Sequence, residues 1–232
     1  MSDKLEVRIQ QTADSKKLNR FTFLSELIGI LETGKIRLSD PTNWEDKNDA
    51  LIFKSYMDRR ATKVFAKCFS RVAETIYFWK AYSDGPEGCC IEFDKNLLKE
   101  SLAAVGGVRF GDVVYRKIKK IGEDPADRDK VLFIKRDPYR HEFEFRVLWE
   151  GQTRSEYVEL AFDVSAIRKI TLSQQMPKRY FDIVKQLICD IHPSKNVIVN
   201  KSTVFLNRQW VKRLDSLTNP NPESQQNPTT AP

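Results

Sequence analysis

The sequence lacks several features that would assign it to a common class of protein. It has no apolar run near the roughly 20 residues that a membrane-spanning helix requires. Its first ten residues, MSDKLEVRIQ, lack the apolar core of a signal peptide. We therefore expect a cytoplasmic protein with no membrane partner. A glycine-rich phosphate loop is also missing, because Gly106 and Gly107 are not followed by the Lys-Ser/Thr pair that such a loop uses.

Metal-binding residues are scarce as well. The chain has four cysteines and two histidines, and no two cysteines have the Cys-x-x-Cys spacing. A structural zinc site needs four nitrogen or sulfur ligands at close spacing, so we predict no metal site and expect reduced, buried thiols. If Cys89 and Cys90 lie on a strand, their side chains point to opposite faces of the sheet.

Basic residues are in excess. The formal net charge is +7, and residues 215–232 carry two acids and no base, so the rest of the chain has a charge of +9. This balance favours anionic partners, either nucleotides or nucleic acid. Residues 215–232 also hold four of the ten prolines and are predicted to form a disordered polar tail. Residues 1–16 are predicted to be a flexible N-terminus.

The remaining 17–214 segment is predicted to be one α+β domain. Hydrophobic residues make up 41% of the chain and alternate or cluster in short runs, which indicates strands. The predicted strands cover residues 19–24, 35–39, 64–70, 88–93, 108–115 (as one or two strands), 143–149, 157–162, 170–172 and 197–199. Residues 157–162 are predicted to lie beside 143–149 in the sheet, which we expect to be mostly antiparallel.

Four helices are predicted between these strands. The first begins at a Ser25 cap and ends at Gly34, and the others cover 74–82, a segment capped by Asp94, and 177–191. A short helical stretch is also predicted at 130–135, and residues 205–214 are ambiguous. Helices and strands do not alternate regularly, so α+β is favoured over a doubly wound sheet.

The Glu-Phe-Glu sequence ending at Glu144 is the leading candidate for chemistry. On a strand, Glu142 and Glu144 would share a face, and two such carboxylates can divide the work of orienting a nucleophile and stabilising a developing cation. The competing interpretation is structural: Glu144 and Arg146 would line the wet face of a half-buried strand.

Two aromatic segments are further candidates. Trp79 and Tyr82 would share one helical face, where they could stack on a base or pack in the core. Around Trp44, the carboxylates of Asp46 and Asp49 could bind a metal, hold an arginine or cap a surface loop.

Three segments together resemble the family catalogued as domain of unknown function 2971 (DUF2971). They are GKIRLSDPTNWEDKND (34–49), CFSRVAETIYFWKAYSDGPEGCCIEFD (68–94) and YRHEFEFRVLW (139–149). The resemblance spans about residues 18–200 and is carried mainly by the middle segment, with its W-x-x-Y helix. After the aromatic of the first segment, Glu45, Asp46 and Lys47 replace the usual Asn-Asp-Pro. The resemblance implies a bacterial or phage protein but no chemistry.

The paired glutamates are also similar to the Glu-x-Glu strand of arginine-directed ADP-ribosyltransferases, which likewise have an L-x-x-G-x-I passage, here 31–36. That likeness implies an ADP-ribosyltransferase-like fold and an NAD-using transferase in bacterial or phage conflict, with Glu144 as the catalytic carboxylate and Glu142 as its helper. The cofactor-binding residues would be Arg146, Trp79, Tyr82 and Arg20. The alternative is a non-catalytic nucleic-acid-binding or regulatory module that uses residues 116–120 and 212–213 against phosphates.

Overall fold

A computed structural model describes residues 16–127, 130–193 and 197–218. It confirms the α+β class: nine strands form one sheet, and helices cover both of its faces. The strands of this sheet are β1 (Lys17–Phe23), β2 (Lys35–Ser39), β3 (Lys63–Ser70), β4 (Gly88–Asp94), β5 (Val108–Asp112), β8 (Glu144–Gly151), β9 (Tyr157–Ala161), β10 (Ile167–Leu172) and β11 (Ile198–Lys201). A second, two-stranded sheet pairs β6 (Val114–Arg116) with β7 (Ile134–Arg136).

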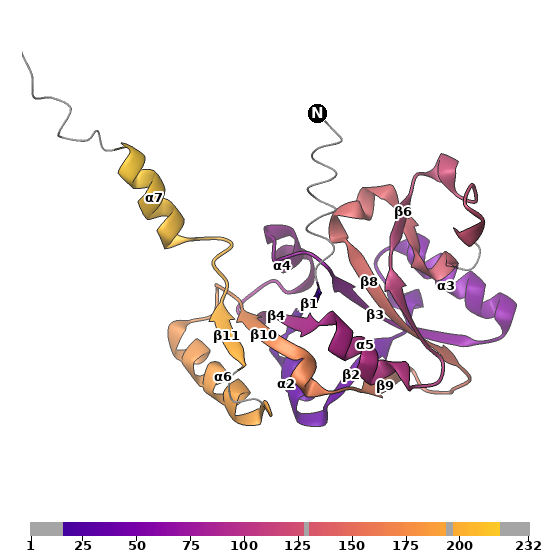
Figure 1. The fold of residues 1–232 in the computed structure, drawn as a ribbon, viewed down its shortest axis with the longest axis horizontal. Helices are drawn as coiled ribbons and strands as arrows, with labels where there is room; N and C mark the ends of the chain where they lie inside the picture. Colours follow the sequence, from indigo (N-terminus) through magenta and orange to yellow (C-terminus); the bar gives the residue numbers. More distant parts are fainter. Residues whose placement is uncertain (1–15, 128–129, 194–196, 219–232) are drawn as a thin grey trace, which may run out of the picture.

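The helices are α2 (Leu24–Thr33), α3 (Lys47–Arg60), α4 (Ile76–Tyr82), α5 (Lys95–Ala103), α6 (Lys178–Ile191) and α7 (Arg208–Thr218). Short 3-10 turns are η1 (Pro41–Asn43), η2 (Ile118–Lys120), η3 (Pro125–Asp127), η4 (Val131–Phe133), η5 (Asp137–Glu142) and η6 (Val164–Ala166). Figure 1 shows α6 beside β11 at one end of the fold, α3 at the other, and α7 standing off the body. Within the described residues, no helix combines the length and apolarity needed to cross a membrane.

The main sheet is antiparallel except where β10 runs parallel to β11, in the order β11-β10-β4-β1-β3-β2-β9. One edge of strand β3 pairs along its whole length with β8, and β8 in turn pairs with β5. By contrast, β1 meets β3 at the single pair Asn19–Ser70, and β2 meets it at Ser39–Ala66. The sheet is therefore split along one edge of β3, and backbone groups there are free to face a cavity.

Hydrophobic side chains pack on both faces of the sheet. The largest cluster lies under α2, α5 and α6, with Leu27, Leu98 and Ile188 as buried members. Two smaller clusters lie on the opposite face, one under α3 around Phe53 and one under α4 around Phe78. Cys89 belongs to the large cluster and Cys90 to the α4 cluster, which confirms that they point to opposite faces. All four cysteines are free thiols; Cys68 and Cys189 are only partly buried.

Most predicted elements are present with small shifts at their ends. Gly34 caps α2 in the left-handed conformation, with φ of 63°, and Asp94 caps α5 by accepting hydrogen bonds from Asn96 and Leu97. The N-cap of α2, however, is Phe23 rather than the predicted Ser25. The stretch predicted as helical at 130–135 is one 3-10 turn followed by strand β7.

Three larger predictions are corrected. Strand β9 pairs with β2, not with β8, because β3 and β5 already occupy both edges of β8. Residues 47–60 form α3, where no helix was predicted. Residues 208–214 of the ambiguous segment and the start of the predicted polar tail form α7, which continues to Thr218. The rest of that tail and residues 1–15 lie outside the described residues.

Candidate functional site

A cavity of about 670 Å³ opens at the split in the sheet. Its walls come from β1, the edge of β3, the segment before α3, helix α4 and the start of β8. Four predicted site residues line it: Arg20, Tyr82, Glu142 and Glu144. The size falls within the roughly 300–1,000 Å³ that is usual for small-molecule sites.

The two glutamates reach the cavity by different routes. Glu144 is the first residue of β8, whereas Glu142 ends the 3-10 turn η5, so the prediction that they share one strand is wrong. Between them Phe143 adopts a left-handed φ of 44°, which redirects the chain. Lys135 joins the two side chains all the same: its Nζ lies 2.7 Å from Glu142 Oε2 and 3.3 Å from Glu144 Oε2.

Behind Glu144 lies a buried ion network centred on Arg146. This arginine has no exposed surface. Its Nε donates to Glu144 Oε1 at 2.6 Å and its Nη2 donates to Asp49 Oδ2 at 2.5 Å, while Nη1 donates to the carbonyl of Leu132. Because Arg146 is absent from the cavity lining, its predicted role in binding a cofactor is corrected: it positions Glu144 and Asp49.

These contacts fix the charge of Glu144. Burial alone would raise the pKa of its carboxyl, but Arg146 and Lys135 beside it lower that pKa to about 2. Glu144 is therefore an anion at every physiological pH. It can stabilise a nearby positive charge but cannot act as a proton donor. Asp49 differs, because burial raises its pKa despite the contact with Arg146.

Helix α4 supplies an aromatic wall. Tyr77 and Tyr82 are both exposed at the cavity, and the Tyr82 hydroxyl donates to Glu142 Oε1 at 3.0 Å. Trp79, which was predicted to act with Tyr82, is 2% exposed and lies outside the cavity lining. Its ring packs edge-on against Phe21 and its Nε1 donates to Glu74. Trp79 is thus a core residue, which corrects the prediction.

Residues in the segment before α3 form another part of the cavity wall. Asp46 caps α3 by accepting the backbone N–H of Asn48, as the loop-cap interpretation predicted, while Asp49 holds an arginine. Trp44 lines the cavity, and its ring centroid lies 5.4 Å from the Arg146 guanidinium. Across the described residues, no group of three or more His, Cys, Asp or Glu side chains is arranged to hold a metal.

Two further cations belong to the cavity lining. Arg20 projects from β1 and Lys67 from β3, and both line the cavity. Lys67 is buried and forms an ion pair with Glu26 of α2. Burial and the neighbouring Arg20 lower the pKa of the Lys67 ammonium to about 8, although Glu26 acts in the opposite direction. No role was predicted for Lys67 or Lys135. The signal available for Lys67 is its place as a lone lysine inside the apolar VFAKCFS run.

This lowered pKa has a consequence for stability. The unfolded chain binds the Lys67 proton up to its ordinary pKa of 10.5, whereas the folded protein releases it near pH 8, so this group makes stability rise with pH between those values. From about pH 7.5 to about pH 9.5 we expect a gain of about 2 kcal/mol in the free energy of unfolding from this residue. Urea denaturation of wild type and Lys67→Arg would measure it, since arginine stays charged throughout. Equal pH profiles for the two proteins would contradict the assignment.

No family model matches the chain, and no curated protein matches it. Among solved structures, three of Thermus sp. 2.9 DarT are similar. The complex with ADP-ribosylated single-stranded DNA has a TM-score of 0.40 at 13% identity, covering 83% of this chain and 96% of that one. The NAD+ complex has a TM-score of 0.41 at 12% identity, covering 84% and 98%. The carba-NAD+ complex has 0.39 at 12%, covering 85% and 98%. At these TM-scores the likeness transfers neither ligands nor activity to this chain.

Proposed function

We propose that the cavity is the active site of a nucleotide-directed enzyme, an NAD-using transferase of the ADP-ribosyltransferase type. The observation that carries this proposal is the ionised Glu144 carboxylate, buried in the wall of a cavity that also has cationic and aromatic walls. Membership of the DUF2971 family and a role in bacterial or phage conflict remain predictions from the sequence.

Glu144 suits a reaction that develops positive charge. Cleavage of the bond between ribose and nicotinamide passes through an oxocarbenium-like state, and a fixed anion stabilises such a state when water is excluded. Arg146 and Lys135 hold Glu144 in place and keep it ionised. Glu142, which accepts hydrogen bonds from Tyr82 and Lys135, would orient the attacking group.

The other walls suit the rest of a dinucleotide. Tyr77 and Tyr82 present rings on which a base or nicotinamide can stack. Arg20 and Lys67, which also line the cavity, provide positive charge for phosphates. Anionic, aromatic and cationic walls thus meet in one cavity, as a ligand with a cationic ring, a ribose and a pyrophosphate would require.

Thermal shift with NAD and chromatographic measurement of nicotinamide release test this proposal. At a ligand concentration of about 100 times the Kd, NAD should stabilise the protein by about 2.7 kcal/mol. Tyr77→Ala should weaken binding, whereas the matched change Tyr180→Ala, at an exposed position on α6 outside the cavity, should not. An NAD titration that shifts neither melting temperature nor nicotinamide release would contradict the proposal.

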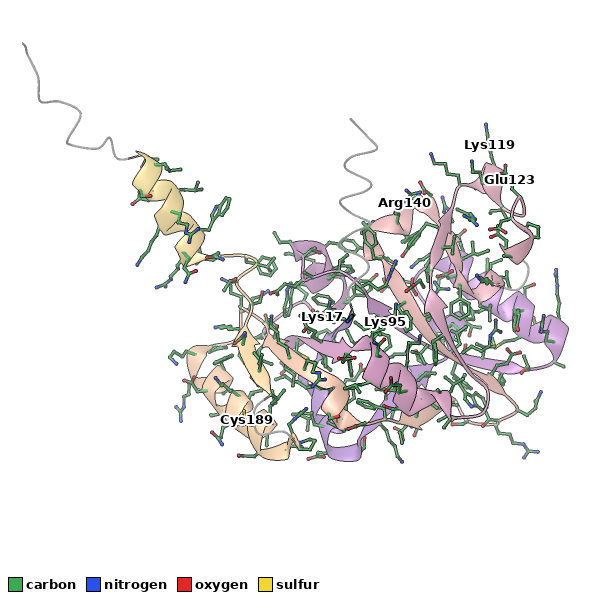
Figure 2. The ribbon with its side chains drawn as sticks, in the orientation of Figure 1. Lys17, Lys95, Lys119, Glu123, Arg140 and Cys189 are labelled. Atoms are coloured by element: carbon green, nitrogen blue, oxygen red, sulfur yellow. The ribbon has the colours of Figure 1, made fainter. Side chains whose placement is uncertain are left out.

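A second candidate function is the non-catalytic nucleic-acid-binding or regulatory module, and a basic groove favours it. The groove, of about 480 Å³, lies between residues 116–120 and 136–138. Arg116 is neutralised by Asp124 and Asp127, but Lys117, Lys119 and Arg136 are exposed and have no acidic partner in the part of the chain that the structure describes. Lys119 points away from the fold in Figure 2. Residues 212–213 are exposed on α7, separately from this groove.

Salt dependence separates the two functions. If the groove contacts about four phosphates of single-stranded DNA, affinity should fall about 50-fold between about 50 and 200 mM salt, because bound cations are released from the DNA. Lys119→Glu should reduce both the affinity and this slope, and Lys185→Glu on the outer part of α6 serves as the charge-matched control. DNA affinity that changes neither with salt concentration nor with Lys119→Glu would exclude the groove as a phosphate-binding surface. The rate of NAD turnover, in contrast, should vary little over the same range of salt concentration.

A further inference from the structure

Exposed apolar side chains are concentrated in the last part of the described chain. Of the nineteen large apolar side chains that are exposed among the described residues, ten lie between residues 180 and 217. Two helices carry most of them: α6, whose inner face packs on the main hydrophobic cluster, and α7, in which no residue is buried. Figure 1 shows α7 projecting away from the sheet. Such a concentration of exposed apolar surface marks an interaction site.

Helix α7 has the pattern of a helix that packs against a partner. Trp210, Leu214 and Leu217 follow one another at i, i+4 and i+7 and form one stripe, with Val211 beside it, and all four are exposed. The helix has 11 residues, fewer than the roughly 12–15 that even a favourable isolated helix needs in water. The stripe therefore needs a surface to cover it, and no other part of the described chain does so.

Helix α6 has an uncovered stripe of the same length. Tyr180, Ile183 and Leu187, at i, i+3 and i+7, are exposed on the flank of α6, beside the face that packs on the sheet. From its first to its last residue each of the two stripes is about 10 Å long, because a helix rises about 1.5 Å per residue. The α7 stripe can therefore lie along the α6 stripe.

The charges beside the two stripes are complementary. Arg213 lies next to Trp210 on the surface of α7. Asp190 lies next to Leu187 on α6, where it accepts a hydrogen bond from the side-chain amide of Gln186. Within the described residues neither Arg213 nor Asp190 belongs to an ion pair. Each stripe thus has an unpaired charge at its border, positive on α7 and negative on α6.

The start of α7 is anchored to the body of the protein, and this sets the direction of the helix. Oε1 of Gln174 accepts the backbone N–H of Phe205 at 3.0 Å and that of Leu206 at 3.1 Å. The next residue, Asn207, caps α7, because its Oδ1 accepts two backbone N–H groups of the first turn. No free residue separates the anchor from the cap, so α7 cannot turn back onto α6 of its own chain. The α6 stripe of a second copy has no such restriction.

We infer that this surface joins two copies of the chain in a twofold-symmetric dimer, in which the α7 stripe of each copy packs on the α6 stripe of the other. The contact then occurs twice, and seven exposed apolar side chains of each copy become buried. At roughly 100 Å² for each side chain, the dimer would bury about 1,400 Å². Specific interfaces bury about 1,200–2,000 Å². None of the seven lines the cavity, so the inference does not depend on the proposed function.

Sedimentation velocity of the full chain tests the inference. Wild type should sediment as a dimer at about 50 µM, because interfaces of this size have dissociation constants of about 1 µM or lower. Leu214→Glu on α7 and Ile183→Lys on α6 should each raise the dissociation constant at least about 100-fold, because symmetry places the charge in both contacts. Both side chains are exposed, so the variants should fold, and circular dichroism checks this.

An equal mixture of the two variants identifies the surfaces that meet. A dimer with one copy of each has one contact of wild-type sequence, and in its other contact the two introduced charges have opposite signs. We therefore expect the mixture of Leu214→Glu and Ile183→Lys to recover dimers that neither variant forms alone. If α7 packed on α7, or α6 on α6, no dimer would be recovered, and that result would overturn the arrangement.

Ser216→Glu, on the polar side of α7, is the matched control and should keep the wild-type dimer. A wild type that sediments as a monomer overturns the inference, and so does a dimer that survives Ile183→Lys. Vesicles of phosphatidylserine and phosphatidylcholine test the other surface that a basic amphipathic helix fits. A monomeric wild type that binds these vesicles, and loses that binding in Leu214→Glu, would assign α7 to a membrane surface and overturn the dimer.

Discussion

Replacing Arg146 with methionine is expected to lower the free energy of unfolding by about 3–5 kcal/mol. The guanidinium is completely buried and is the shared partner of two carboxylates, Glu144 and Asp49, whose side chains are each 6% exposed. Methionine fills much of the same volume and can pack near the rings of Trp44 and Phe53, so the loss would arise from the charges left behind. For a chain of this length the melting temperature should fall by roughly 10 °C.

Urea denaturation of Arg146→Met and of Arg37→Met measures this. Arg37 also pairs with a glutamate, Glu159, but 57% of its side chain is exposed and the pair spans 3.5 Å. Its removal should cost less than about 1 kcal/mol. Adding Asp49→Asn to Arg146→Met should recover part of the loss, since one unpaired carboxylate is removed. A loss below about 1 kcal/mol for Arg146→Met alone would show that the buried network does not hold this part of the fold together.

Local sequence patterns predicted the strands well because burial and alternation are local properties. The segment 35–39 alternates between polar and apolar residues and forms β2 with those limits, and Asp94 and Gly34 mark helix ends through their own side-chain or backbone chemistry. Helix α3 was missed although the sequence contains its signals, an Asp46 cap and apolar side chains at Phe53 and Met57. The polar and apolar residues of α3 do not separate into clear faces, so hydrophobic periodicity gives little sign of this helix.

Strand partners and long-range ion pairs could not be predicted from local sequence patterns, because they depend on the topology of the whole sheet. Nothing local indicates that β9 leaves β8 for β2, or that Asp49 contacts an arginine 97 residues away. Strand alternation did place Glu144 and Arg146 on one face, yet that face is buried, where the structural interpretation expected it to be wet. Lys135 joins the two glutamates from a small sheet inserted between β5 and β8.

Burial of Glu144 means that the catalytic and structural roles are combined in one side chain, and the chain provides a way to separate them. Asp49 holds the same guanidinium as Glu144 but does not line the cavity. We expect Glu144→Gln to reduce NAD turnover by about 10²–10⁴-fold, because the neutral amide no longer stabilises developing positive charge. Asp49→Asn should keep turnover within a few-fold of wild type.

Both variants should lose stability, since each removes one of the two carboxylates that pair with a fully buried arginine. Turnover and melting temperature therefore need to be measured on the same preparations, at a temperature where each variant is folded. Glu144→Asp serves as a third point: it keeps the charge but withdraws it by one methylene, so activity should fall less than in Glu144→Gln. If Glu144→Gln and Asp49→Asn lose turnover in proportion to their loss of stability, Glu144 is only a partner of Arg146, and the chemistry of this cavity lies elsewhere.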